Sequence, residues 1–387
     1  MATKRDLLLI SSLLFTLLLI TPQKIFSTDL PKSIQKILKK GKMDPSILSD
    51  IDTELKVPKK FIEGAKKEGK LRILSTLDPR QAKAIFKPFN ERYPYVSIEY
   101  SRASGPIRRI KTLTALKLGR LVTDILTGVG GSYFLFREAN GLEDLRDIPN
   151  WKNNPEGTKD PDGFWVGMHL RYWCMGYNTE LVKKEDLPKK WEDLLSNPRW
   201  RNGNLALGNR AQLWALMLWK AKGEEWTKNF LTKLFTEVKP QLRKEGMNAM
   251  LGLTIVGEFH GNVPAGGYRA LQKVKLGAPI GWTCPEPVPV AVSEMTILRG
   301  APNMNAAKLF INWFLSKEGQ IAQYVTNFAP PVHKDLRGKQ YLPFPDAIIG
   351  KKISFRDPGM EVDIQPKLLK FWNKLWLAGG GEPRERR

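Results

Sequence analysis

The sequence predicts an α/β protein built from two lobes, with the chain passing between the lobes twice. Residues 71–131 alternate short β-rich runs with amphipathic helical segments. Residues 165–178 form a long apolar and aromatic run without turn signals, long enough to pass from one domain into another. Residues 277–320 join a proline-interrupted extended segment to a β-rich run and an amphipathic helix. These three observations favour two α/β lobes with a cleft between them.

The first element is an apolar N-terminal segment. A short basic start is followed by residues 7–20, which contain no charge. Fourteen residues fall short of the about 20 that a membrane span needs, and they suit the central region of a secretory signal peptide. We therefore expect residues 1–27 to be a signal peptide and the mature protein to be exported and soluble. An uncleaved membrane anchor is the alternative.

Composition supports a globular protein larger than one domain. The chain has 387 residues, 42% of them apolar, and a formal charge of +23. Lysine and arginine are scattered along the chain and mixed with acidic residues, as in 184–193 (KEDLPKKWED). A nucleic-acid surface would instead cluster its positive charge on one element. We expect a basic solvated surface and no nucleic-acid partner.

Residues 28–56 are predicted as a helical extension, after which the first lobe begins. The expected elements are a helix over 58–67 that stops at Gly69, a strand over 71–75, a helix over 81–94, a strand over 95–103, a helix over 105–120 and a strand over 123–131. This order implies right-handed crossovers and a mostly parallel sheet. Ligands of such sheets lie beyond the carboxyl ends of the strands, here at loops 75–78, 102–105 and 128–131.

The second half of the chain is predicted to form the other lobe and then return. Residues 165–178 make the first crossing and 278–287 the second, and the return includes a helix over 305–318 that stops at Glu318-Gly319. The expected domains are 57–168 (first part of lobe 1), 169–283 (lobe 2), 284–334 (return to lobe 1) and 335–387 (C-terminal helical segment and disordered tail).

Six stretches carry a resemblance to a known family. They are 63–78, 95–105, 175–182, 191–207, 277–292 and 301–320, among them MGYNTELV and GAPIGWTCPEPVPVAV. In this order they resemble the extracellular solute-binding proteins of ABC importers, in the iron(III)-type branch. The resemblance implies a two-lobe type II periplasmic-binding-protein fold with two interlobe crossing strands. It also implies a periplasmic location, no enzymatic activity, no cofactor and delivery of a solute to an inner-membrane ABC permease. We expect a monomer.

The metal chemistry of the iron-binding branch transfers poorly. Those members hold the metal with adjacent tyrosines, which supply hard oxygen ligands. At the matching place this chain has Gly266-Gly267-Tyr268-Arg269, a single tyrosine next to a cation. Glu258 and His260 offer further ligand atoms, although a pair of this kind in a loop is more often ordinary surface. We therefore expect no metal site, and keep a ferric ligand as the alternative.

Arginine is the residue type that best suggests a ligand. Arg102, Arg210 and Arg269 each follow a predicted strand, and guanidinium groups bind carboxylate or phosphate through paired donors. The hypothesis is a small anionic or carboxylate-bearing solute. The candidate ligand-binding residues are Ser75, Thr76, Asp78, Arg102, Ser104, Gly130, Arg210, Tyr268 and Arg269. The alternative is that these arginines are exposed or pair with local acids.

The predicted crossings contain aromatic residues and both cysteines of the chain. Tyr172, Trp173 and Trp282 either stack on a planar ligand or pack between the lobes as hinge residues. Cys174 and Cys284 lie one on each crossing, and export makes a disulfide chemically possible. The hypothesis is a bond that pins the two hinge strands together.

Motifs of the common enzyme classes are absent from the sequence. It contains no GxxxxGK[ST], HExxH, CxxC or GxSxG. Its three histidines, His169, His260 and His333, are too far apart in sequence to nominate an acid–base pair. Two other classes of function are alternatives. One is an exported enzyme on this fold, and the other is a basic envelope protein that binds polyanions.

Overall fold

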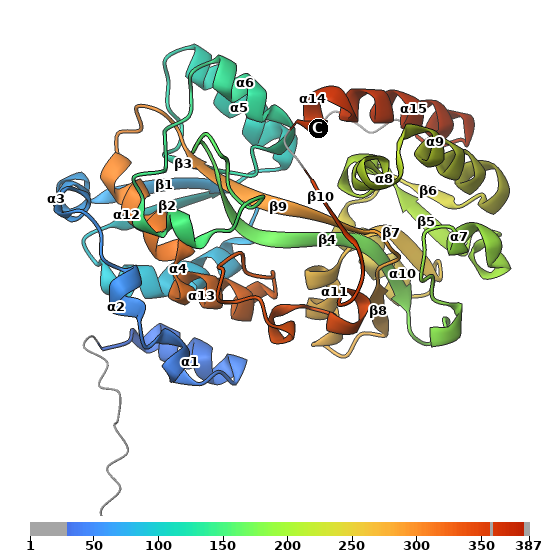
Figure 1. Ribbon diagram of the computed structural model, residues 1–387, viewed down its shortest axis with the longest axis horizontal. Coiled ribbons are helices and arrows are strands. Elements are labelled where there is room, and N and C mark those ends of the chain that lie inside the picture. Colours follow the sequence, from blue (N-terminus) through green and yellow to red (C-terminus); the bar gives the residue numbers. More distant parts are fainter. Residues whose placement is uncertain (1–28, 357–358, 383–387) are drawn as a thin grey trace, which may run out of the picture.

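A ten-stranded sheet runs through both lobes of the described chain. The computed structural model describes residues 29–356 and 359–382, so the predicted signal peptide lies outside the described residues. The strand order is β2-β1-β3-β9-β4-β7-β5-β6, with β10 paired to β9 and β8 paired to β4 (Figure 1). Helices cover the sheet in each lobe, as expected for an α/β protein.

Lobe 1 has the predicted β-α-β-α-β order. Its strands are β1 (Lys70–Ser75), β2 (Ser97–Arg102) and β3 (Ile125–Thr127), connected by α4 (Pro79–Arg92) and α5 (Gly105–Lys117). β1 pairs in parallel with both β2 and β3, and Ile73 lies opposite Tyr100 and Ile125. The preceding helix, α3 (Lys59–Glu68), ends at Gly69, whose φ of +62° suits glycine. The carboxyl ends of all three strands therefore lie together at one edge.

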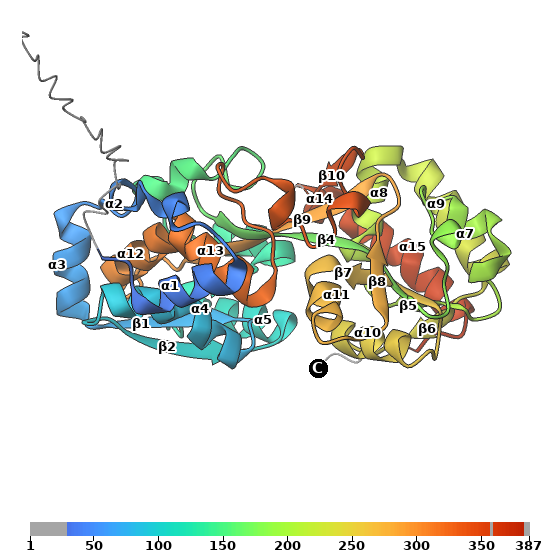
Figure 2. The same ribbon diagram turned by 90° about the horizontal axis from the view of Figure 1, so that it is seen from below.

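Two antiparallel strands connect the lobes. The first half of β4 (Val166–Asn178) pairs with β9 (Val288–Ile297), and its second half pairs with β7 (Gly261–Gly266) and β8 (Ile280–Thr283). β4 is the uninterrupted apolar run seen in the sequence. The return passage is β9, whereas residues 278–287, expected to cross, form β8 and the turn that follows it inside lobe 2. Figure 2 shows β4 and β9 between the two lobes.

Lobe 2 has a core rich in tryptophan. Trp191, Trp200 and Trp214 are fully buried, and Trp191 stacks on Trp214 with ring centres 5.0 Å apart. The remaining elements of this lobe are α7 (Asp193–Ser196), β5 (Leu205–Gly208), α8 (Ala215–Lys222), α9 (Glu224–Lys233), the π-helical turn Leu234–Val238, β6 (Gln241–Arg243), α10 (Met247–Ile255) and α11 (Gly267–Val274).

The C-terminal segment completes lobe 2 rather than lying apart from it. β10 (Ile353–Phe355) pairs with the crossing strand β9, and α14 (Met360–Asp363) and α15 (Gln365–Ala378) follow. Trp372 and Trp376 of α15 are buried in the same cluster as Trp214. Residues 383–387, which include most of the predicted tail, lie outside the described residues.

The N-terminal extension packs on lobe 1. α1 (Lys32–Gly41) buries Ile34 and Leu38 against α13 (Lys317–Asn327), and α2 (Ile51–Glu54) follows (Figure 2). The predicted helix over 305–318 is wrong in its end. α12 (Met304–Leu315) stops at Ser316, whose hydroxyl accepts a hydrogen bond from the Gly319 N–H and begins α13. α6 (Tyr133–Glu138) lies on the other face of lobe 1, and no helix in the described ranges has the length and apolarity needed to cross a bilayer.

Candidate ligand-binding cleft

A cavity of about 430 Å³ lies between the lobes, within the range of small-molecule sites. Its lining comes from the strand ends of lobe 1, from the crossing strands and from the start of α11 in lobe 2. The lining residues are Thr76, Leu77, Asp78, Arg80, Gln81, Arg102, His169, Arg171, Trp173, Asn248, Tyr268, Arg269, Gln272, Ser293 and Asn327.

The lobe 1 wall is made by the loops that follow β1 and β2. Asp78 caps α4 by accepting a hydrogen bond from the Arg80 N–H at 3.0 Å, which fixes the loop. Arg102 ends β2, and its Nη1 lies 4.0 Å from Asp78 Oδ2. The Arg102 side chain is 55% exposed, so this contact leaves the guanidinium free to accept a ligand. Thr76, Asp78 and Arg102 thus lie together, where the sequence predicted a ligand.

The lobe 2 wall is the first turn of α11, which follows β7 directly. Arg269 Nε donates a hydrogen bond to the Tyr268 hydroxyl at 2.8 Å, and Arg269 Nη1 donates to Asn248 Oδ1 at 2.5 Å. These two contacts hold the guanidinium at the cavity, and no carboxylate of the described residues pairs with it. A positive group is therefore held in place on the lobe opposite Arg102.

The floor of the cavity is β4, whose residues His169, Arg171 and Trp173 face the same side because strand residues alternate. Ser293 of β9, the register partner of His169, lines the cavity beside it. Only Trp173 of these four was predicted. The signal for His169 and Arg171 in the sequence is their alternate spacing as polar residues within an otherwise apolar strand.

His169 is a neutral hydrogen-bonding residue. Burial, together with the nearby Arg171 and Arg269, lowers the pKa of its imidazole to about 3. Gln323 Nε2 lies 2.5 Å from His169 Nδ1. With Nδ1 accepting this hydrogen bond, Nε2 carries the proton and is a donor.

Positive charge dominates the cavity. Four arginines line it, Arg80, Arg102, Arg171 and Arg269, and Asp78 is the one carboxylate among the described lining residues. Burial lowers the pKa of the Arg171 guanidinium, with Glu294 acting in the opposite direction. Arg171 Nη2 donates to the Val292 carbonyl at 3.0 Å, and its buried Nε makes no hydrogen bond within the described residues. An anion would satisfy such a lining.

Four predicted ligand-binding residues lie away from the cavity. Ser75 is 2% exposed and accepts a hydrogen bond from the Thr127 hydroxyl, so it supports the sheet instead. Ser104 precedes α5, and Arg210 precedes a short turn in lobe 2. Gly130 lines a separate small cavity described below. Sequence position after a strand placed these residues near the edge but could not say which way each side chain points.

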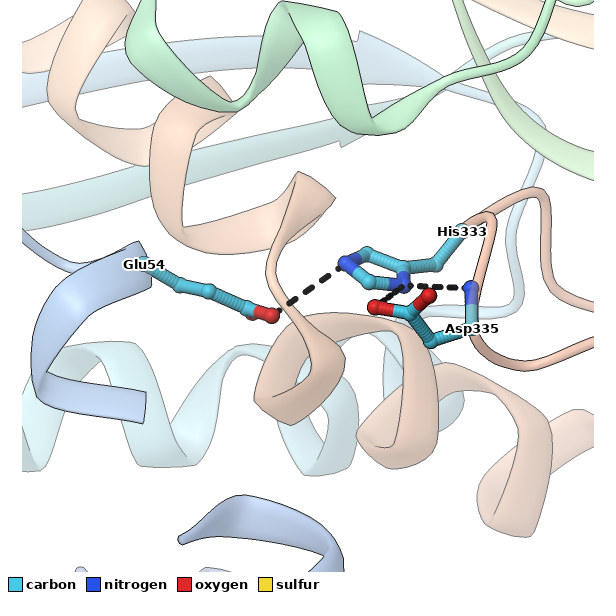
Figure 3. A group of neighbouring side chains, drawn as sticks. All are labelled: Glu54, His333 and Asp335. Carbon is cyan, nitrogen blue, oxygen red and sulfur yellow. Dashed lines mark hydrogen bonds and ion pairs between the residues drawn. The ribbon is translucent and has the colours of Figure 1, made fainter. Parts of the chain in front are cut away.

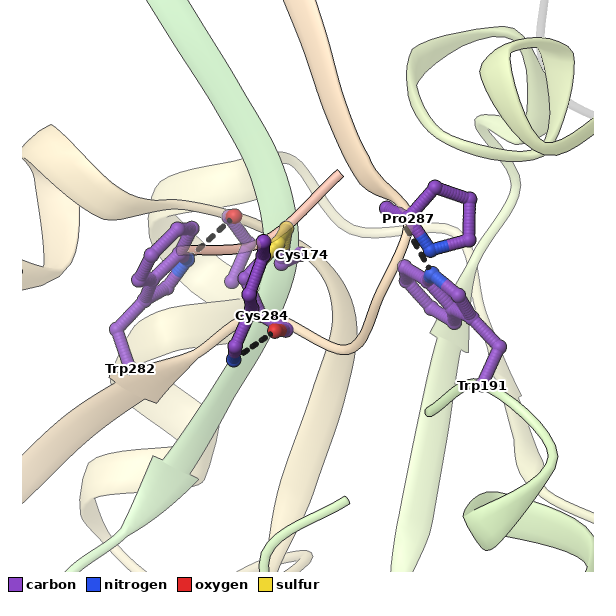
Figure 4. The surroundings of a disulfide bond; sticks show 7 residues. Cys174, Trp191, Trp282, Cys284 and Pro287 are labelled. Atoms are coloured by element: carbon purple, nitrogen blue, oxygen red, sulfur yellow. Dashed lines mark hydrogen bonds between the residues drawn. A yellow bond between two sulfur atoms is a disulfide. The ribbon is translucent and has the colours of Figure 1, made fainter. Parts of the chain in front are cut away.

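Two predicted hinge aromatics are packing residues. Tyr172 and Trp282 belong to a buried cluster in which Trp282 stacks on Phe344 with ring centres 5.6 Å apart. Trp282 Nε1 donates to the Ala265 carbonyl at 2.9 Å (Figure 4). Neither lines the cavity, because alternation along the strand turns Tyr172 away from the face that carries Arg171 and Trp173.

A disulfide bond joins Cys174 of β4 to Cys284, which follows β8 (Figure 4). Both cysteines are fully buried, and their Cα atoms are 5.0 Å apart. Met175 of β4 lies opposite Thr283 of β8 beside the bond. The bond therefore fastens the lobe 2 end of β4 to the segment that leads into β9, and leaves the middle of both crossing strands without a covalent link.

Comparison with known proteins now identifies the family. Residues 123–347 match the family described as bacterial extracellular solute-binding protein. The chain belongs to this family. An uncharacterized protein of Haemophilus influenzae is 34% identical over 190 residues, which cover 43% of this chain and 49% of that protein. Iron uptake protein A2 of Synechocystis is 25% identical over 258 residues, 61% of this chain and 70% of that protein. The chain thus spans about half the length of the first of these relatives.

Solved structures confirm the two-lobe periplasmic-binding-protein fold of this solute-binding protein. Iron-bound HitA from Pseudomonas aeruginosa superposes with a TM-score of 0.66 at 19% identity, over 79% of this chain and 99% of HitA. FutA of Trichodesmium in complex with iron and citrate has a TM-score of 0.63 at 18% identity, over 81% of this chain and 100% of that chain. About a fifth of this solute-binding protein therefore has no counterpart in either structure.

Iron is named for some of these similar proteins, and two groups of potential metal ligands occur among the described residues of this chain. Glu258 Oε1 lies 3.4 Å from Arg243 Nη1, and neither Glu258 nor His260 lines the cleft. Glu54, His333 and Asp335 form the one group of at least three potential ligands among the described residues (Figure 3).

The Glu54 cluster is built to hold the N-terminal extension. Glu54 lies 3.3 Å from His333 Nε2, whereas the Asp335 N–H donates to His333 Nδ1 at 3.1 Å, so the two acids flank opposite edges of the ring. Lys317 Nζ also lies 3.8 Å from Glu54, and the Lys317 N–H donates to Glu54 at 2.7 Å. A metal ion held by these three side chains would meet the Lys317 ammonium group beside Glu54. The cluster ties α2 to α13 and the loop that follows it.

Proposed function

We propose that this protein is the periplasmic substrate-binding component of an ABC importer, and that it captures a small anionic or carboxylate-bearing solute. It works as a monomer without catalysis, and delivers the solute to a permease in the inner membrane. Family membership supports the transport role. The single observation that carries the ligand class is a cavity with four arginines and one carboxylate.

Both lobes, and the strand that joins them, contribute arginines to the ligand cavity. Arg102 lies on lobe 1, Arg269 on lobe 2 and Arg171 on the strand that joins them. A solute with two or three acidic oxygens would contact all three arginines only when the lobes approach each other. Binding would then favour the closed state, because the ligand has more favourable contacts there. A permease that binds only the closed form would distinguish ligand-bound from ligand-free protein.

The test begins with the natural ligand. Native mass spectrometry of the protein, purified without dialysis, should reveal a bound mass that dissociates on denaturation and carries acidic groups. Calorimetry with that compound should then show Arg269→Ala binding at least tenfold more weakly, since a charged hydrogen-bond pair contributes about 1.5–3 kcal/mol. A neutral co-purified solute, or unchanged affinity in Arg269→Ala, would refute the proposed ligand class.

A ferric ligand is the second candidate, favoured by Tyr268 at the start of α11 and by the iron named for several relatives. A bare ferric ion would meet Arg269 beside the tyrosine. A ferric ion wrapped in an anionic chelator would instead present carboxylates to the arginines. Elemental analysis of the purified protein, with a visible tyrosinate-to-iron absorption band, would support this candidate. Iron at far below one equivalent after ferric citrate loading would exclude it.

A further inference from the structure

The C-terminal segment is anchored to lobe 2. Ser354 of β10 donates a hydrogen bond to the Met217 carbonyl at 2.7 Å, and Trp372 Nε1 of α15 donates to Asn209 Oδ1 at 2.9 Å. Met360, Leu368 and Trp372 lie in the hydrophobic core of that lobe. These contacts fix α14, which lies between β10 and α15.

α14 reaches back across the crossing strands to lobe 1. It contacts the turn Gly130–Ser132, and a Cβ atom placed on Gly130 would lie 3.7 Å from Glu361 Oε1 (Figure 1). The space between is a cavity of only about 20 Å³, lined by Val129, Gly130, Tyr133, Trp165, Val292, Glu294, Arg356 and Glu361. The Glu361 carboxylate is therefore enclosed where the two lobes meet.

Glu361 lies within a cluster of arginines. Arg356 Nη2 is 2.5 Å from Glu361 Oε1, and the Glu361 side chain is 5% exposed. Burial, with a smaller contribution from Glu294, outweighs the lowering effects of Arg356, Arg109 and Arg171 and raises the pKa of the Glu361 carboxyl to about 7. Glu361 Oε2 and Glu294 Oε2 are buried and make no hydrogen bond within the described residues. The Glu361 carboxylate thus interacts electrostatically with Arg356, Arg109 and Arg171.

Arg171 connects this cluster to the ligand cavity. It lines the cavity with Arg102 and Arg269, and it also interacts electrostatically with Glu361 and Glu294. A negative charge on Glu361 therefore offsets part of the positive potential that a solute in the cavity experiences. Glu361 does not line that cavity, so its effect on the solute acts through charge rather than contact.

We propose that Glu361 is a specificity-determining residue that limits the negative charge of the solute the cleft accepts. When ionised, its carboxylate is a counter-charge to Arg171 and Arg109 and opposes each added negative charge on the solute. This inference rests on the proposed function, since it concerns the same cleft. For two unit charges on the order of 10 Å apart in an effective dielectric constant of about 20, Coulomb's law gives an effect on affinity of about tenfold per unit of solute charge.

The experiment compares Glu361→Gln with wild type by calorimetry at pH 8, using methanesulfonate, sulfate and citrate as probes with one, two and three negative charges. Glu225→Gln is the matched control, because it removes one exposed carboxylate on α9 and leaves the cleft unchanged. The expected result is tighter binding by Glu361→Gln that grows with probe charge, from about tenfold for methanesulfonate to at least a hundredfold for citrate. Glu225→Gln should match wild type within about twofold.

A second readout uses pH, with sulfate as the probe because it does not titrate in this range. Between pH 8 and pH 5.5, wild-type affinity should rise toward that of Glu361→Gln as Glu361 takes up a proton. The groups facing Glu361 are Arg356, Arg109, Arg171 and Glu294. They are shared by both proteins, so the affinity of Glu361→Gln over the same range measures their contribution. Thermal unfolding confirms that each variant folds.

With probes that wild type binds, three outcomes overturn the inference. They are equal tightening in Glu225→Gln, a gain that does not depend on probe charge, and weaker binding by Glu361→Gln. These results leave the proposed function intact if wild type still binds the anions. Failure of both wild type and Glu361→Gln to bind any probe overturns the inference too. A neutral co-purified solute in native mass spectrometry then shows that the proposed ligand class has failed as well.

Discussion

Tyr268 and Arg269 are consecutive residues whose side chains contact each other in the first turn of α11. Arg269 Nε donates to the Tyr268 hydroxyl at 2.8 Å, and its guanidinium carbon lies 5.4 Å from the centre of the Tyr268 ring. The tyrosine therefore positions a cation, an arrangement that suits the anionic solute proposed above better than a bare metal ion.

Separate substitutions of Tyr268 and Arg269 distinguish an anionic solute from a ferric ligand. For an anionic solute, Arg269→Gln should weaken binding by about 10- to 100-fold, whereas Tyr268→Phe removes one hydrogen bond from the Arg269 guanidinium but keeps its charge, and should cost less than about tenfold. Arg269→Lys keeps the charge and should fall between Arg269→Gln and wild type. Calorimetry with the co-purified solute measures all three. For a ferric ligand the order would reverse, with Tyr268→Phe the more damaging change.

Removing the disulfide should destabilise the protein without abolishing ligand binding. The bond closes a loop with a sequence separation of 110 residues, and such cross-links contribute about 2–5 kcal/mol. Cys174→Ala combined with Cys284→Ala should lower the urea midpoint, with solute affinity changed less than about threefold. Wild type treated with dithiothreitol is the control. Two free thiols in wild type under denaturing, non-reducing conditions would contradict the assignment.

A buried ion pair between α4 and α13 should be a major contributor to the stability of lobe 1. Glu318 is fully buried, and its carboxylate accepts hydrogen bonds from Arg92 Nε and Nη2 at 2.6–3.0 Å and from Trp313 Nε1 at 2.8 Å. Glu318→Gln leaves the Arg92 charge buried without a counter-charge, and should cost about 3–5 kcal/mol in the free energy of unfolding. Chemical denaturation measures this loss.

The matched control for Glu318 is Glu224→Gln, which breaks an exposed ion pair with Lys228. It should leave the denaturation midpoint close to that of wild type, because solvent screens an exposed ion pair. Equal losses in the two variants would mean that burial of the Arg92–Glu318 pair has no special energetic role.

Stability should fall with rising pH because of Glu361. Its pKa of about 7 in the folded protein lies above the ordinary value of 4.5, so the folded state binds the proton more tightly than the unfolded state. Protonated Glu361 contributes about 3 kcal/mol to the free energy of unfolding below about pH 4.5. This contribution is lost as the pH rises from about 4.5 to about 7. Glu361→Gln should show a flatter stability profile than wild type between pH 5 and pH 8. Parallel profiles from denaturation at several pH values would contradict this.

Several features of the fold could be predicted because their cause is local. The spacing of apolar residues predicted the helices and strands of lobe 1, and Gly69 ended α3 through its positive φ. The long apolar run at 165–178 predicted β4 because a strand buried along its length carries few polar residues. Thr76, Asp78 and Arg102 were predicted in the cleft because strand order places their loops at one edge, whereas Tyr268 and Arg269 were predicted from the strand before them and from the family resemblance.

The end of the return helix shows where local patterns fail. Glu318-Gly319 resembles a helix stop, yet Ser316 ends α12 and begins α13, and Glu318 is buried against Arg92. That ion pair joins residues 226 positions apart, so no window of sequence contains both partners.

The sequence by itself determined the α/β class, the order of lobe 1 and the presence of arginine near the strand ends, since each depends on short-range periodicity and chain order. Only the tertiary structure decided which arginines meet in one cavity, that His169 and Arg171 form its floor, and that Glu361 lies beside them. The physical reason is that β4 and β9 take their register from pairing across more than a hundred residues. That register, together with the anchoring of α15 by its tryptophans, fixes the direction of side chains that local preference leaves open.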